Sequence, residues 1–260
     1  MTSAIVLCGG LGTRMGKTGI HEQKVMSKVC GTPLLELILT QVCASVPAPA
    51  PVVLLTGHRG ADVAAAVPDW HRRVDARIEG VSECAPGAVG VLHLAERLPA
   101  PVLIVAGNVL LPYTRLLPHM LEQWSTDGRP VTAGSRQWRT EGHHTVNAQD
   151  TTVTSWHRLP HRESGRYEVV DSYLITSQVL SLMRAGSEPI SHTRALAALV
   201  PHGAVAFREF TGDWLHVQTP ADLAVAPSRK DILCPPLPWS SSPVPPGPER
   251  PTWPASSPPA

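Results

Sequence analysis

The N-terminal half of the chain alternates short apolar runs with segments whose apolar residues recur at helical spacing. The apolar runs predict strands at residues 4–8, 51–56, 74–78 and 101–106. Spacings of three and four positions predict helices at residues 33–46, 61–67 and 87–98. This alternation implies right-handed crossovers, so we expect an α/β fold with a Rossmann-like, mostly parallel sheet flanked by helices.

The second half of the chain has a weaker pattern and ends in a change of composition. Strands are expected at residues 130–135, 146–156 and 168–176, with polar segments between them. Beyond residue 226 the chain consists mainly of proline and serine, so it offers too little apolar surface to offset the entropy of ordering it. We therefore expect one folded domain over residues 1–226 and a disordered, Pro-rich tail over residues 227–260.

Composition narrows the class of protein. The chain has 260 residues, of which 43% are hydrophobic, enough for one sizeable core. Its net charge of +1, without a run of basic residues, argues against nucleic acid as a partner. Five scattered cysteines form no C-x-x-C pair, which fits reduced thiols. Neither a signal peptide nor an apolar run of membrane-spanning length is seen. A cytoplasmic enzyme is expected, and its oligomeric state, including a homo-oligomer, stays open.

A glycine-rich loop follows the first expected strand, with the sequence Leu7-Cys8-Gly9-Gly10-Leu11-Gly12-Thr13-Arg14-Met15. Glycines let a backbone approach a ligand closely, and successive N–H groups in such a loop bind anions. Arg14 adds a fork of donors that suits phosphate oxygens. The loop matches neither G-x-G-x-x-G nor the P-loop pattern, and paired glycines also occur in such turns for steric reasons alone. Together with Lys24, the loop favours a phosphate-rich ligand.

The order of these residues resembles the signature of the sugar-phosphate nucleotidyltransferases, L-x-G-G-x-G-T-R-[ML], then P-K, then G-x-P-[LM]-[LI]. Here the last part reads Gly31-Thr32-Pro33-Leu34-Leu35. The resemblance extends over residues 3–225 and includes a late segment at 211–223 that is similar to W-x-D-I-G-T-P-x-D-L. It implies a nucleotide-diphospho-sugar transferase fold, like the catalytic domains of N-acetylglucosamine-1-phosphate uridylyltransferase and mannose-1-phosphate guanylyltransferase.

This resemblance also implies a reaction, the transfer of a nucleoside monophosphate from an NTP to a sugar phosphate with release of pyrophosphate. Such catalysis consists of positioning and of neutralising phosphate charge. Arg14 would stabilise the departing pyrophosphate and Lys24 the α-phosphate. Glu168 or Asp171 would contact the sugar. The nucleotide would be bound by Leu7, Gly9, Gly10, Gly12, Thr13, Gly87 and Ala88.

The chain departs from the family pattern at the metal positions. A divalent metal, Mg²⁺ or Mn²⁺, is expected at two aspartates in the family, but Asn108 and His216 stand there. Magnesium prefers anionic oxygen ligands, whereas imidazole suits zinc, manganese or cobalt better. Gln23 replaces the proline that precedes Lys24 in the family pattern, and an asparagine expected within residues 169–171 is absent.

Three functional classes follow from these departures. The first is an active nucleotidyltransferase with an altered metal site. The second is a non-catalytic homologue that binds nucleotide and regulates a partner enzyme. The third is the same fold turned to another reaction on a phosphorylated or nucleotide-linked substrate. Arg14 and Lys24 favour the first and third, because a pure scaffold needs neither.

Overall fold

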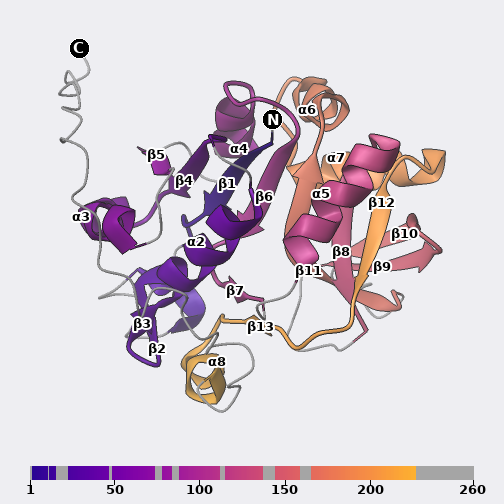
Figure 1. Cartoon of the computed structure of the whole chain (residues 1–260). Helices are drawn as coiled ribbons and strands as arrows, with labels where there is room; N and C mark the ends of the chain where they lie inside the picture. The colour runs from indigo at the N-terminus through magenta and orange to yellow at the C-terminus, as the bar shows by residue number, and fades with distance from the viewer. Residues whose placement is uncertain are drawn as a thin grey trace.

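The structure is a computed structural model of the chain (Figure 1). It describes residues 2–10, 12–15, 23–46, 49–73, 78–83, 88–111, 115–136, 144–158 and 165–226. The expected tail at 227–260 lies outside these residues, as does Gly87. Within the described ranges, no helix combines the length and apolar character needed to cross a membrane.

A nine-stranded sheet forms the centre of the fold, with the order β5-β4-β1-β6-β11-β8-β12-β10-β9. Its strands are β1 (Ser3–Leu7), β4 (Val52–Thr56), β5 (Ile78–Glu83), β6 (Val102–Ala106), β8 (Val131–Ser135), β9 (His144–Gln149), β10 (Thr152–Arg158), β11 (Tyr167–Ile175) and β12 (Ala206–Phe210). The strands β5, β4, β1 and β6 are parallel to one another. β11 runs antiparallel to both β6 and β8, so the sheet as a whole is mixed.

Helices cover both faces of the sheet because its strands alternate their side chains. In β1, Ala4 and Val6 belong to the core that α2 (Leu34–Ser45), α3 (Gly60–Arg73) and α5 (Leu116–Asp127) cover. Ile5 belongs to the core under α4 (Ala88–Ala95), α6 (Ser177–Arg184) and α7 (His192–Leu199). This period of two places a buried strand between two layers of helices. The expected α/β fold with flanking helices is confirmed.

Small elements complete the end of the sheet where the site lies. They are the 3-10 helices η1 (Thr13–Met15) and η2 (Lys24–Met26), the strand pairs β2 (Lys28–Val29) with β3 (Thr32–Pro33) and β7 (Val109–Leu110) with β13 (Leu215–His216), and α8 (Pro220–Val225). A third 3-10 helix, η4 (Val200–His202), follows α7 and leads into β12. α8 begins with a capping box, in which Thr219 and Asp222 each bond the other's backbone N–H.

One expected strand is placed differently in the structure. Residues 146–156 were expected as one strand but form the hairpin of β9 and β10, which turns at Asp150 with φ of 53°. The polar residues around this turn supply turn chemistry that the apolar pattern does not register. Of the strand expected at 74–78, residues 74–77 lie outside the described residues, and Ile78 is the first residue of β5.

Candidate functional site

The carboxyl ends of β1, β4 and β6 meet at glycine turns that pack backbone against backbone. A Cβ at Gly9 would lie 3.1 Å from the nitrogen of Gly57, and one at Gly107 would lie 2.7 Å from the carbonyl oxygen of Leu7. The N–H of Gly107 donates to that same oxygen at 2.8 Å. A side chain is therefore excluded at Gly107, a Cβ at Gly9 would be tight against the backbone of Gly57, and the loop after β1 is held against its neighbours.

Gln23 holds the glycine-rich loop in place. Its side-chain amide nitrogen donates to the carbonyl oxygens of Cys8, of His58 at 3.2 Å and of Gly10 at 3.4 Å. Its Oε1 accepts from the N–H of Val25 at 3.1 Å, which caps the helix η2 that carries Lys24. One buried side chain thus joins the loop after β1, the turn after β4 and the segment of Lys24.

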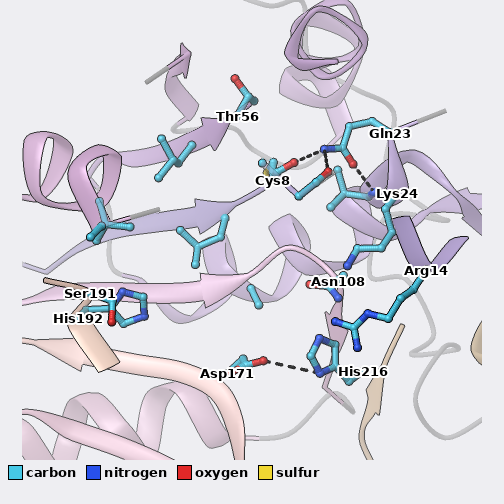
Figure 2. A pocket seen from close by; sticks show the side chains of 18 residues that line it. Cys8, Arg14, Gln23, Lys24, Thr56, Asn108, Asp171, Ser191, His192 and His216 are labelled. Carbon is cyan, nitrogen blue, oxygen red and sulfur yellow. Dashed lines mark hydrogen bonds and ion pairs between the residues drawn. The ribbon is translucent and has the colours of Figure 1, made fainter. Parts of the chain in front are cut away.

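A cavity of about 360 Å³ opens beside this loop (Figure 2), which is within the usual size of small-molecule sites. Its lining consists of Leu7, Cys8, Gly9, Gly10, Arg14, Gln23, Lys24, Val25, Leu55, Thr56, Ala88, Val91, Ala106, Asn108, Asp171, Ser191, His192 and His216. These residues come from both halves of the sheet, so the cavity lies across the boundary between its parallel and antiparallel parts.

Two cationic side chains approach one end of the cavity. Arg14 extends from η1 and Lys24 from η2 (Figure 2). Burial, together with the charge of Arg14, lowers the pKa of Lys24 to about 8. Two cations beside exposed backbone N–H groups form an environment suited to a polyphosphate.

Asn108 and His216 are brought together by the short strands β7 and β13. Val109 pairs with His216 in this ladder, and the amide nitrogen of Asn108 donates to the carbonyl oxygen of Val217 at 2.8 Å. The N–H of Val217 donates back to the carbonyl oxygen of Asn108 at 2.9 Å. Both Asn108, which immediately precedes β7, and His216, on β13, line the cavity.

Asp171 lies on β11 beside this pair. Its Oδ2 is 3.7 Å from Nδ1 of His216, and its Oδ1 accepts a hydrogen bond from the hydroxyl of Tyr173 at 2.8 Å. Burial, followed by the charge of Asp171, raises the pKa of Tyr173. Tyr173 is therefore a neutral donor that fixes the position of the carboxylate.

The chemistry of these donors decides which metal they fit. The described residues contain no group of three or more His, Cys, Asp and Glu side chains that could hold a metal ion. Because the amide nitrogen of Asn108 is bonded to Val217, its oxygen is the atom left to bind a cation. A neutral amide oxygen and an imidazole fit Mn²⁺ or Co²⁺ and match the preference of Mg²⁺ poorly.

The cavity brings together most of the residues predicted from sequence. Leu7, Gly9, Gly10, Arg14, Lys24, Ala88, Asn108, Asp171 and His216 all line it. Gly12, with φ of 63°, and Thr13 form the turn that leads to Arg14 and are not part of the lining. Glu168 is buried on β11 and also lies outside the lining.

Sequence reasoning missed three polar residues of the cavity, namely Gln23 as a brace, Ser191 and His192. Gln23 was interpreted only as the residue that replaces the proline before Lys24 in the family pattern. Ser191 caps α7 by accepting from the N–H of Arg194 at 3.2 Å. A serine before a helical apolar pattern is a start signal that could have located this helix, although not its place beside the cavity.

The architecture is that of the nucleotide-diphospho-sugar transferase fold. The profile of the MobA-like NTP transferase domain matches residues 4–201, and the chain belongs to this family. His216 lies beyond the matched range. A search of curated proteins finds no match.

Solved structures show the same fold. A UDP-glucose pyrophosphorylase complexed with UDP-glucose has 11% identity and a TM-score of 0.74, over 88% of this chain and 98% of that chain. The inositol-1-phosphate CTP transferase from T. maritima has 21% identity and a TM-score of 0.67, over 88% and 96%. A protein from Bacillus anthracis assigned as a glucose-1-phosphate thymidylyltransferase has 15% identity and a TM-score of 0.75, over 88% and 94%.

Proposed function

We propose that this protein transfers a nucleoside monophosphate from an NTP to a sugar phosphate or a related phosphorylated acceptor. The observation that carries the proposal is the single cavity that joins the braced glycine loop, Arg14 and Lys24 to a polar wall formed by Asp171 and His192. One end suits a triphosphate, and the other offers room and polar groups for a second substrate.

The reaction needs few covalent roles from the protein. An oxygen of the acceptor phosphate attacks the α-phosphorus, the bond from that phosphorus to the oxygen bridging to the β-phosphorus breaks, and pyrophosphate leaves with that oxygen. Lys24 would lie against the α-phosphate, and Arg14 would stabilise the charge of the departing pyrophosphate. Fixed positive charges of this kind favour the transition state without having to reorganise.

Asn108 and His216 would hold a divalent metal, Mn²⁺ in preference to Mg²⁺. When bound, such an ion neutralises phosphate charge and orients the phosphates. Asp171 is the carboxylate next to this pair. The ladder of β7 and β13 fixes the positions of the Asn108 amide and the His216 imidazole.

A screen for pyrophosphate release tests the proposal. It combines four NTPs with a panel of acceptors that includes glucose 1-phosphate and inositol 1-phosphate, and with Mg²⁺, Mn²⁺ or Co²⁺. We expect turnover with one acceptor, faster with Mn²⁺ or Co²⁺ than with Mg²⁺. The variant Lys24→Met should remove it. Absence of turnover with every combination would contradict the proposal.

The double variant Asn108→Asp with His216→Asp tests the account of the metal site. It restores two hard anionic ligands, so we expect the initial rate with Mg²⁺ to rise and the preference for Mn²⁺ to fall. The single variants serve as controls for loss of the β7–β13 contacts. Strong Mg²⁺-dependent turnover in the wild type that is lost in the double variant would show that this account is wrong.

One observation favours a second candidate function. Both family aspartates are replaced, by Asn108 and His216, while the loop and its brace are intact. This combination would also suit a non-catalytic homologue that binds nucleotide and regulates a partner enzyme. Nucleotide binding by calorimetry without turnover under any metal would favour this second function.

A further inference from the structure

The wall of the cavity opposite the cationic end is the N-terminus of α7. Ser191 is the cap of this helix and His192 its first residue. Figure 2 shows both on the far side of the cavity from Arg14 and Lys24, with the ring of His192 directed inward. The imidazole packs edge-on against the ring of Tyr173, with 4.9 Å between ring centroids and 65° between planes.

One nitrogen of this imidazole is left without a partner by the fold. His192 is 9% exposed, and its Nδ1 is buried with no hydrogen-bond partner among the described residues. Buried polar atoms are nearly always hydrogen-bonded, and those that are not are unfavourable. Packing against Tyr173 therefore accounts for the ring of His192 and leaves its Nδ1 unexplained.

The protonation state of His192 limits what it can bind. Burial lowers its pKa to about 4, and the positive end of the α7 dipole also disfavours an imidazolium. At neutral pH the ring carries one donor and one acceptor. A neutral ring of this kind matches a hydroxyl group, which both donates and accepts, and it offers no charge to a phosphate or a carboxylate.

We propose that His192, at the start of α7, binds a hydroxyl group on the uncharged part of the acceptor. This assignment rests on the proposed function and deepens it. In this arrangement Arg14 and Lys24 bind the phosphates, and His192 binds the uncharged polyol part of the acceptor. The acceptor class that fits is a phosphorylated sugar or cyclitol, whose hydroxyl groups can both donate to and accept from a neutral imidazole.

Two substitutions separate the polar role of His192 from its packing role. His192→Phe keeps an aromatic ring against Tyr173 and removes both nitrogens. His192→Asn keeps a polar amide near the position of Nδ1 and removes the ring. His202→Phe, at an exposed site outside the cavity lining, is the matched control. Each protein is measured for KM of the acceptor, affinity for the NTP by calorimetry, and melting temperature.

The proposal predicts a distinct set of changes. In His192→Phe the KM of the acceptor should rise at least tenfold, while NTP affinity changes less than twofold. Its melting temperature should be equal or higher, because an unpartnered polar atom has been removed. His192→Asn should recover part of the acceptor affinity. Unchanged acceptor KM in His192→Phe, with a lower melting temperature, would show that His192 is only a packing residue.

The contact between His192 and an acceptor hydroxyl can also be tested by binding alone. Its absence can then be distinguished from failure of the proposed nucleotidyl transfer. The ring nitrogens of His192 are followed by ¹⁵N NMR while glucose 1-phosphate or inositol 1-phosphate is added to the NTP-bound protein. A saturable shift that is absent with inorganic phosphate supports a hydroxyl contact, even if no nucleotidyl transfer occurs. If neither compound shifts these nitrogens, the assignment is overturned.

Discussion

The two ends of the cavity are built in opposite ways. The proposed phosphate end is formed by residues close together in the sequence, namely residues 7–10 with Arg14, Gln23 and Lys24, and it relies on backbone groups held by glycine turns and by Gln23. The opposite end is assembled from side chains on separate elements, with Asp171 on β11 and with Ser191 and His192 at the start of α7. The first end carries two cationic side chains, Arg14 and Lys24, whereas the second carries the carboxylate of Asp171 and the buried imidazole of His192.

This difference explains which part of the site a sequence can reveal. A loop that packs backbone against backbone needs positions with little or no room for a Cβ, as at Gly9 and Gly107. Glycine occurs at such positions, so the sequence shows where they are. A wall of side chains needs only that the fold bring them together, and their spacing along the chain carries no sign of that. We therefore expect a change at one end of the cavity to leave binding at the other end nearly unchanged.

The largest expected effect is at the phosphate end. Arg14→Ala removes a charge-assisted contact worth about 1.5–3 kcal/mol, so NTP affinity should fall at least tenfold. Calorimetry with the NTP measures this directly. Arg184→Ala, which removes a surface ion pair with Glu96, is the control and should leave affinity unchanged. Unchanged affinity in Arg14→Ala would mean that the loop is not the nucleotide site.

Much of the fold was predictable from local patterns. Strands at 4–8, 51–56 and 101–106 are fully apolar because they are covered on both faces, and the structure confirms each of them within a residue or two. The hairpin at Asp150 was not predicted, because its turn depends on one left-handed residue within a polar stretch. The antiparallel insertion of β11 between β6 and β8 is a long-range pairing that no local pattern specifies.

The candidate site likewise has one part that the sequence predicts and another that depends on contacts between distant residues. Arg14, Lys24 and the glycines follow from a contiguous motif, and the structure places them at one cavity. The meeting of Asn108 with His216 was expected from the resemblance, and the β7–β13 ladder brings the two together. The roles of Gln23 and His192 depend on contacts with distant residues such as His58 and Tyr173, so neither could be derived from spacing.

The second prediction concerns His192 and the dependence of folding stability on pH. The pKa of His192 is lowered from 6.5 to about 4 in the folded protein by burial, so the unfolded chain binds its proton first as pH falls. Stability is therefore full above pH 6.5 and is lost as pH falls toward 4. Between pH 7.5 and pH 5, His192 should account for a loss of about 2 kcal/mol.

Urea denaturation of the wild type and of His192→Phe at both pH values measures this contribution. The variant lacks the titrating ring, so its free energy of unfolding should fall less on acidification, by about 2 kcal/mol. His202→Phe, at an exposed site, should fall as much as the wild type. Equal losses in the wild type and His192→Phe would show that His192 is not buried as a neutral ring.

The third prediction tests whether the phosphate end depends on its brace. Gln23→Met keeps the volume of the side chain and removes the bonds to Cys8, Gly10 and His58. Loosening the loop should weaken NTP binding about fivefold, or about 1 kcal/mol. Calorimetry gives the affinity, and thermal unfolding gives the accompanying loss of stability.

Gln123→Met is the matched control for this brace. Gln123 also donates to two backbone carbonyl oxygens, those of Phe207 at 3.2 Å and Thr151 at 3.5 Å, on a part of the sheet outside the cavity lining. Its loss should lower the melting temperature without changing NTP affinity. If both variants weaken NTP binding equally, Gln23 has no particular role in the site.

The smallest expected effect is that of removing residues 227–260. Their proline and serine content leaves little apolar surface to offset the entropy of ordering them, and the described residues already form both cores and the cavity. Truncation after residue 226 should therefore leave the melting temperature, NTP affinity and acceptor KM nearly unchanged. A fall of several degrees would mean that Trp239 or Trp253 packs on the domain, for which the exposed Val225 on α8 is the nearest apolar contact along the chain. Restoring the full melting temperature with a tail that carries both tryptophans, and not with one that has alanine in their place, would then identify the contact.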